Sequence, residues 1–289
     1  MAERVRARGR SVRELAPAKV NLILQVGRRR GDGLHELCSL FASIELADGV
    51  EVALADSRDC PDTVRTPGID GPDICVSALA ELRAASGAGL PPLDVTIDKR
   101  IPVAAGLGGG SADAAAVLRA ANELAGRPLS THGLRNVAAR VGADVPSQIE
   151  PTHAVVGGAG ELVEPVPLPP LWLVLVPQHE GLSTADVYAE ADRIGATRRE
   201  LDPEAVRAAA RQEPRTLAAS LANDLQAAAL SLRPELRAPI AALEAAGAMG
   251  ALLSGSGPTA VGVFEDEHSA RDSAGPGDIV ARIRNNPPF

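Results

Sequence analysis

The sequence predicts a protein of mixed helices and strands arranged in two lobes. The chain has 289 residues, enough for one large domain or two ordinary ones. Period-two strand patterns alternate along it with alanine-rich helical stretches. A proline-dense segment at residues 165–170 has the composition of a connector. We therefore expect this segment to lead from one lobe to the other.

The elements follow in order from local patterns. Strict alternation of apolar and polar residues at 93–98 predicts a half-buried strand, and strong helix formers after residue 111 predict a helix that ends before Gly126. Residues 4–13 are basic and aperiodic, which predicts a frayed extension, and residues 58–72 predict a loop. The same criteria give strands at 12–26, 48–56, 93–98, 171–176 and 259–264, and helices at 74–85, 112–124, 131–140, from 183 onward, and in three stretches between 202 and 246.

Composition limits the class of protein. Hydrophobic residues make up 45% and charged residues 23%, which is typical of a globular chain. The net charge of −8 argues against non-specific nucleic-acid binding. No apolar run is long enough for a membrane span or a signal peptide, so we expect a cytoplasmic protein without a membrane or nucleic-acid partner. The cysteines, Cys38, Cys60 and Cys75, lack metal-site spacing and are expected to be reduced thiols.

A glycine cluster at residues 106–110 stands between a predicted strand and a predicted helix. Backbone N–H groups at such a turn point along the positive end of the helix dipole, which suits a phosphate. Gly110 precedes Ser111 where the P-loop motif has lysine, and Ser111 replaces the third glycine of the dinucleotide motif. We therefore predict a phosphate-binding loop of another kind, with Ser111 at the helix N-cap. The alternative is a turn whose glycines serve packing only.

Other positions suggest chemistry less specifically. Lys19 and Asn21 share one face of an apolar strand, although a lysine that faces water is the alternative. Asp144 lies in a glycine-entered turn, where it either caps a helix or acts as an acid or base. A second glycine loop at 254–258 is either functional or a hairpin-like turn. His35 alone indicates little.

Three segments together resemble the motifs of the GHMP kinases, in order and in spacing. They are Pro-Ala-Lys-Val-Asn-Leu at 17–22, Gly-Leu-Gly-Gly-Gly-Ser-Ala-Asp-Ala-Ala at 106–115, and Ser-Gly-Ser-Gly-Pro-Thr at 254–259. Residues 32–37 and 142–146 further resemble the branch that phosphorylates the 2-hydroxyl of a cytidyl-bearing acceptor in non-mevalonate isoprenoid biosynthesis. The resemblance covers residues 15–264. It implies an α+β, two-lobed fold with the active site in the cleft between an N-terminal α/β lobe, 1–165, and a C-terminal α+β lobe, 166–289.

The resemblance also implies roles for individual residues. Asp144 would take the proton from the acceptor hydroxyl, and Lys19 would stabilise the site electrostatically. ATP and Mg²⁺ would be the cofactors, with Ser111 a possible magnesium ligand, and the enzyme a monomer or homodimer. The residues implied for ATP are Pro102, Ala104, Gly106, Gly108, Gly109, Gly110, Ser111 and Ala112, and those implied for the acceptor are Asn21, Leu34, His35, Thr184, Tyr188 and Gly255.

This chain also departs from the branch pattern. Leu34 stands where an aromatic residue is usual against the cytosine, with Tyr188 expected to supply the other ring. Further departures occur beside the predicted site, at Asp73, Ser147, Gln148, Glu150 and Pro151. Two alternatives therefore remain beside the cytidyl-acceptor kinase. One is a divergent kinase that acts on another hydroxylated metabolite, and the other is a catalytically weak nucleotide-binding relative.

Overall fold

The computed structural model describes residues 10–57, 60–68, 74–87, 90–178 and 180–285, which form two compact units. The first unit comprises Asp48–Arg100, Gly110–Ile149 and the described part of residues 1–16; the second comprises Pro17–Ala47, Ile101–Gly109 and the described part of residues 150–289. The units alternate along the sequence, and the long strands β1 (Ser11–Arg29) and β2 (His35–Leu54) each contribute residues to both. The predicted lobe boundary between residues 165 and 166 is a different division and stays a prediction.

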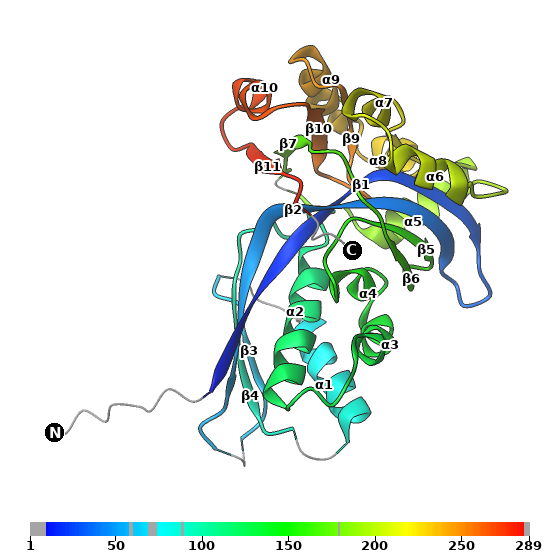
Figure 1. The fold of residues 1–289 in the computed structure, drawn as a ribbon. Helices are drawn as coiled ribbons and strands as arrows, with labels where there is room; N and C mark the ends of the chain where they lie inside the picture. Colours follow the sequence, from blue (N-terminus) through cyan, green and yellow to red (C-terminus); the bar gives the residue numbers. More distant parts are fainter. Residues whose placement is uncertain (1–9, 58–59, 69–73, 88–89, 179, 286–289) are drawn as a thin grey trace. The chain divides into compact units, whose positions relative to one another are not determined.

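The first unit packs helices against a small sheet. The second half of β2 pairs antiparallel with β4 (Leu93–Asp98), which pairs in parallel with β3 (Thr63–Arg65). Helices α1 (Ile74–Ser86), α2 (Gly109–Leu124) and α3 (Thr131–Val141) lie on one side of these strands, and the short α4 (Val145–Gln148) contacts α3 (Figure 1). As predicted, β4 alternates, with Leu93, Val95 and Ile97 in the core. Alanines allow α2 to be buried almost all round.

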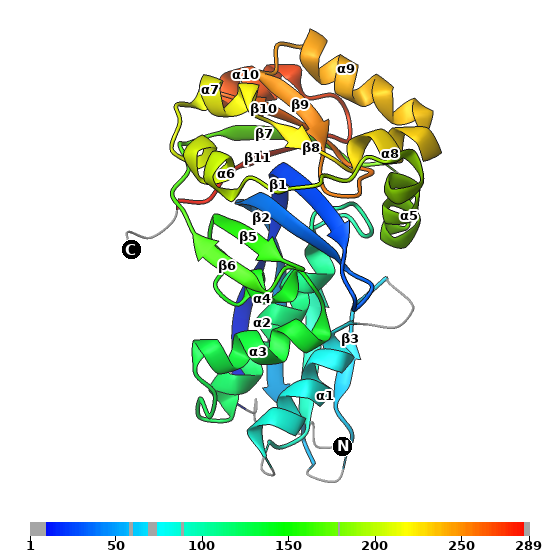
Figure 2. The ribbon, with the colours of Figure 1, turned by 90° about the vertical axis from the view of Figure 1, so that its right-hand side faces the viewer.

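The second unit contains the first half of β2 paired with β5 (Ala154–Gly158), the hairpin partner β6 (Leu162–Pro165), and β8 (Ala222–Asn223) parallel to β1. A separate antiparallel sheet has the order β11 (Ile279–Arg282), β7 (Trp172–Val176), β10 (Ala260–Phe264) and β9 (Gly250–Leu253). The helices of the second unit are α5 (Thr184–Ile194), α6 (Pro203–Ala210), α7 (Pro214–Ala219), α8 (Gln226–Leu232), α9 (Arg237–Ala245) and α10 (Glu267–Ser273) (Figure 2). Together the two units confirm the predicted α+β class with two domains.

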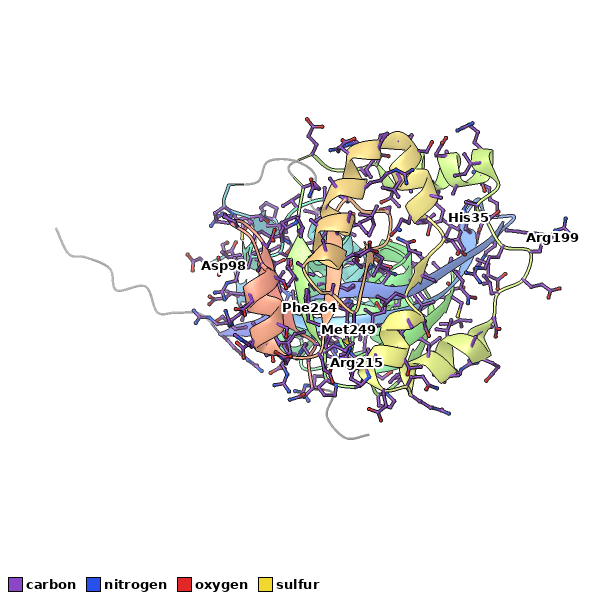
Figure 3. The ribbon with its side chains drawn as sticks, turned by 90° about the horizontal axis from the view of Figure 1, so that it is seen from above. His35, Asp98, Arg199, Arg215, Met249 and Phe264 are labelled. Carbon is purple, nitrogen blue, oxygen red and sulfur yellow. The ribbon has the colours of Figure 1, made fainter. Side chains whose placement is uncertain are left out.

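Period-two alternation explains why both faces of the four-stranded sheet are covered. Leu173 and Leu175 of β7 belong to the core shared with β1 and β2, whereas Val174 between them belongs to the core under the helices. Phe264 of β10 lies with Val174 in that second core (Figure 3). The sheet is therefore a middle layer of this unit. Among the described residues, no helix is long and apolar enough to cross a membrane.

The strands differ from the prediction in several places. The prediction lacks β5, β6, β8, β9 and β11, and β2 begins at His35 and not at residue 48. Residues 11–13 belong to β1 and are not a frayed extension, because β1 continues beside β2, where Arg13 pairs with Glu51. The predicted loop at 58–72 contains β3, whose short pairing with β4 leaves no periodic signal in three residues.

The helices differ as well. Helix α2 begins at Gly109, so Ser111 lies in its first turn and is not the N-cap; the left-handed backbone conformations end at Gly108, and the helix starts directly after it. Between residues 202 and 246 the chain forms four α-helices, α6 to α9, and a 3₁₀ turn at Pro234–Leu236, not three helical stretches. Pro203, Pro214 and Pro234 each open a new segment there, because proline suits the first turn of a helix and not its interior.

Candidate active site

Lys19 is buried on β1 in the second unit. Its Nζ donates a hydrogen bond of 2.7 Å to Asn21 Oδ1, as two residues on one face of a strand can do. Asn21 Nδ2 donates to Ser39 Oγ at 2.9 Å, and the Nζ also lies 4.5 Å from the centre of the Phe41 ring. Only 5% of Lys19 is exposed, so the alternative of a lysine facing water is wrong. A buried ammonium can stabilise negative charge on a bound ligand, whereas an exposed one mainly contributes to solubility.

The first part of the glycine loop lies directly against Lys19. The backbone N–H of Lys19 donates to the Leu107 carbonyl at 3.0 Å. Gly106 and Gly108 have φ of +75° and +70°, a conformation that favours glycine, and Ala104 adopts φ of +54° at a cost. A Cβ at Gly106 would lie 2.5 Å from the Ser254 carbonyl oxygen, and one at Gly108 would lie 3.0 Å from Lys19 Cγ. Backbone conformation and packing therefore favour glycine at these two positions, independently of any role in phosphate binding.

The second glycine loop completes the same cluster. Ser254 Oγ accepts from the Asn21 backbone N–H at 3.4 Å and donates to the Gly106 carbonyl at 3.0 Å. A Cβ at Gly255 would lie 3.2 Å from Asn21 Oδ1. Asn223 Nδ2 donates to the carbonyls of Leu253 and Gly255 and so fixes this loop. The three segments that the sequence singled out therefore meet around one buried lysine.

The predicted base-binding residues occupy another part of the second unit. The rings of His35 and Tyr188 have their centres 5.0 Å apart at an interplanar angle of 34°, and Nε2 of His35 lies 2.9 Å from Asp192 Oδ1. His35 opens β2, and Figure 3 labels it. Leu34 is 52% exposed, so it is not a core residue. At the start of α5, Thr184 Oγ1 lies 3.0 Å from Ser256 Oγ of the second glycine loop.

Asp144 belongs to the first unit. It occupies the N-cap position of α4, and its side chain makes no capping hydrogen bond to that helix. Its carbonyl accepts instead from Ser147 Oγ at 2.8 Å. Ser147 and Gln148, two of the departures, are buried in α4, whereas Glu150 is exposed and Pro151 half-buried just beyond it. The departure at Asp73 lies outside the described residues.

The rest of the predicted ATP set differs in exposure. Ala104 and Gly110 are exposed, Pro102, Gly109 and Ser111 are half-buried, and Ala112 is buried inside α2, so its side chain is not available to a ligand. No group of three or more metal-ligating side chains occurs in the part of the chain that the structure describes. Ser111 Oγ, half-buried in the first turn of α2, is a hydroxyl oxygen of the kind that Mg²⁺ binds, so this residue fits the predicted magnesium role.

A cavity of about 890 Å³ in the second unit lies elsewhere. Its wall includes Arg28, Cys38, Gly158, Leu201 and Arg207. None of the residues predicted for ATP or for the acceptor lines it. Burial, which the nearby acids Asp202 and Glu164 reinforce and Arg207 opposes, raises the pKa of Cys38 to about 11, so this thiol is protonated at neutral pH.

Comparison with known proteins identifies the family. The model of the GHMP kinases N-terminal domain matches residues 73–151, and that of the GHMP kinases C-terminal domain matches residues 202–273. Over 262 residues the chain is 42% identical to a 4-diphosphocytidyl-2-C-methyl-D-erythritol kinase of Geobacter metallireducens, covering 90% of this chain and 91% of the relative. The chain belongs to the GHMP kinase family. Like other GHMP kinases it is a phosphotransferase that uses ATP.

Solved structures agree with this GHMP kinase assignment. A 4-(cytidine 5'-diphospho)-2C-methyl-D-erythritol kinase matches with a TM-score of 0.77 and 33% identity, over 95% of this chain and 100% of that one. The mevalonate kinase of L. major matches with a TM-score of 0.71, over 98% of this chain and 99% of that one. Its 16% identity shows the shared fold alone.

Sequence reasoning missed three residues that support the predicted site residues of this GHMP kinase. Ser39 supports Asn21, Asp192 contacts His35, and Asn223 fixes the second glycine loop. None of them lies within a recognisable motif. Ser39 is one strand away from Asn21, and its period-two position on β2 is the one local signal that could have suggested an inward-facing hydroxyl.

Proposed function

We propose that this chain transfers the γ-phosphoryl group of ATP to the 2-hydroxyl of 4-diphosphocytidyl-2-C-methyl-D-erythritol, in non-mevalonate isoprenoid biosynthesis. The observation that supports it most is the meeting of three GHMP motifs around buried Lys19, in a chain 42% identical to a kinase of that name. Phosphoryl transfer depends mainly on positioning and charge stabilisation, which such a cluster supplies.

In this proposal Asp144 accepts the proton of the acceptor hydroxyl. Lys19 stabilises negative charge that develops on the transferring phosphoryl group, and Asn21 holds the ammonium in place through their hydrogen bond of 2.7 Å. The backbone N–H groups of residues 106–111 hold the ATP phosphates. Mg²⁺, when bound by those phosphates and by Ser111 Oγ, neutralises part of their charge.

The acceptor's base would bind near His35 and Tyr188. Nε2 of His35 lies 2.9 Å from Asp192 Oδ1, and in the tautomer that donates to this carboxylate the ring would present Nδ1 as an acceptor for a base amino group. Thr184 and Gly255 would contact the remainder of the acceptor. We propose further that the enzyme acts in the cytoplasm, where ATP is supplied, as a monomer or homodimer; light scattering coupled to gel filtration measures that state.

One observation favours the second candidate, a divergent kinase for a different hydroxylated metabolite. Leu34 is 52% exposed, so it offers an aliphatic surface where the branch pattern has an aromatic ring. A coupled ADP-release assay with the cytidyl acceptor, its uridyl analogue, homoserine and mevalonate separates the two. We expect turnover with the cytidyl acceptor at least 100-fold above the others. Preference for another acceptor would establish the divergent kinase, and ADP release with none would leave only nucleotide binding.

A further inference from the structure

A buried lysine in the first unit bridges two buried carboxylates. Lys99 Nζ lies 2.5 Å from Asp48 Oδ2 and 2.7 Å from Asp113 Oδ2. The exposed fractions of the side chains are 14% for Lys99, 0% for Asp48 and 6% for Asp113. By contrast, the neighbouring pair of Arg100 and Asp98 lies at the surface, with both side chains 68% exposed. The three buried groups form one network, which we call the Lys99 clamp.

The Lys99 clamp joins the two ends of the glycine loop. Lys99 precedes the loop and Asp113 follows it in the second turn of α2, and their ion pair spans 14 positions of the chain. Asp48 on β2 adds a second hold, because its Oδ1 accepts the backbone N–H of Arg100 at 2.5 Å. The Lys99 ammonium therefore connects the start of the loop to Asp113 at its helical end, and Asp48 holds the start of the loop through both Lys99 and the Arg100 backbone.

The conformation of the loop explains why its ends need fixing. Ala104, Gly106 and Gly108 all have positive φ, and Ala104 lacks glycine's freedom at φ of +54°. Such conformations at alternate positions, one of them in a non-glycine residue, persist only where the surrounding structure holds them. Fixed ends also reduce the number of conformations that a loop can adopt, and so keep its backbone N–H groups in one arrangement.

Energetics argue that the clamp is not chiefly a stability device. Removing two carboxylates and an ammonium from water is costly, and apolar replacements of a buried ion network are often equally stable. Here the compensation is incomplete, since Asp113 Oδ1 has no hydrogen-bond partner among the described residues. An ion pair fixes direction and distance in a way that apolar side chains do not, which suits a positional role.

We propose that Lys99 is a positioning residue that holds the glycine loop in its nucleotide-binding conformation, by tying Asp48 before the loop to Asp113 after it. This inference rests on the proposed function, because it takes the loop as the site of the ATP phosphates. It predicts that loss of the clamp weakens nucleotide binding specifically, and leaves the acceptor's site in the second unit unchanged.

The test compares Lys99→Met, Lys99→Arg and Asp113→Asn with the parent, and uses Arg100→Met as the matched control for a surface cation. Calorimetric titration with a non-hydrolysable ATP analogue gives Kd, ADP release gives the acceptor KM, and hydrogen exchange follows the amides of residues 104–110. For Lys99→Met we expect Kd to rise about tenfold, these amides to exchange faster and the acceptor KM to stay within twofold. Lys99→Arg should restore part of the affinity, Asp113→Asn should be intermediate, and Arg100→Met should match the parent.

A folded Lys99→Met chain with parental Kd and exchange overturns the inference, and so does an equal loss of nucleotide and acceptor affinity. If Lys99→Met does not fold, Asp113→Asn decides by the same criteria, since it keeps the shape of the side chain. A parent chain that binds no nucleotide overturns the proposed function itself, and the inference with it.

Discussion

At the scale of single residues, the burial of Lys19 separates its role from that of a surface lysine. Its ammonium is held by Asn21 Oδ1 and lies over the Phe41 ring, so its position is fixed before any ligand binds. Lys19→Met keeps the length of the side chain and removes the charge. We expect turnover to fall roughly 100-fold or more, measured as kcat in the ADP-release assay. Parental kcat in a folded variant would remove Lys19 from the chemistry.

Asp144 gives a second prediction at this scale. Because its side chain makes no capping hydrogen bond on α4, Asp144→Asn should leave the helix stable while removing the proton acceptor. We expect kcat to fall roughly 100-fold or more. Asp98→Asn, which alters an exposed carboxylate beside Arg100, is the control and should turn over like the parent. Equal kcat for both variants would contradict the proposed role of Asp144.

Leu34 and Tyr188 give a third prediction, on acceptor affinity. A leucine covers the face of a base but lacks the π contribution, and base–aromatic stacking is worth about 1 to 3 kcal/mol. The exposure of Leu34 leaves room for a larger ring, so Leu34→Tyr should lower KM for the cytidyl acceptor roughly tenfold. Tyr188→Ala should raise KM, since it also removes the ring that contacts His35. An unchanged KM in a folded Leu34→Tyr chain would exclude stacking at this position.

At the scale of elements, the glycine loop combines binding with packing. Gly106 has φ of +75°, and a Cβ there would lie 2.5 Å and 2.7 Å from two backbone oxygens, those of Ser254 and Gly257. Gly106→Ala should therefore destabilise the fold by about 2 to 5 kcal/mol through strain and overpacking. Gly31, where nothing lies within 4 Å of a Cβ, is the matched control, and Gly31→Ala should leave stability near the parental value. Urea unfolding measures both, and equal midpoints would show that the loop adapts.

A buried histidine, His153, lies where β2 and β5 pair at the end of their sheet. Burial lowers the pKa of His153, whose Nδ1 accepts from the Ser43 backbone N–H and whose Nε2 donates to the Arg284 carbonyl. Since the unfolded chain binds the proton more readily, stability should be full above about pH 6.5 and fall as the pH drops below it. His153→Gln should flatten this fall in urea unfolding between pH 8 and pH 5. Exposed His268 is the control, and an unchanged slope in His153→Gln would refute the assignment.

At the scale of the whole molecule, the sequence predicted those features that depend on a few neighbouring residues. The strand at 93–98, the glycine loop and the following helix were recognised because their periodicity and turn residues lie within one short stretch. The N-cap role for Ser111 was wrong because helical geometry begins as soon as the left-handed run ends, which composition does not reveal. Asp192 and Asn223 were not predicted because their hydrogen bonds are to residues 157 and 32 positions away in the sequence. Family resemblance supplied roles that no spacing could.

The measurement that tests the central claim most directly is ³¹P NMR of the reaction of parent chain, ATP, Mg²⁺ and 4-diphosphocytidyl-2-C-methyl-D-erythritol. The account predicts that a phosphomonoester signal from the 2-phosphate appears in step with ADP, while the diphosphate signals of the acceptor are retained. It also predicts that neither change occurs with Asp144→Asn on the same timescale. ADP formation without a new phosphomonoester, or equal product from the parent and Asp144→Asn, would contradict it.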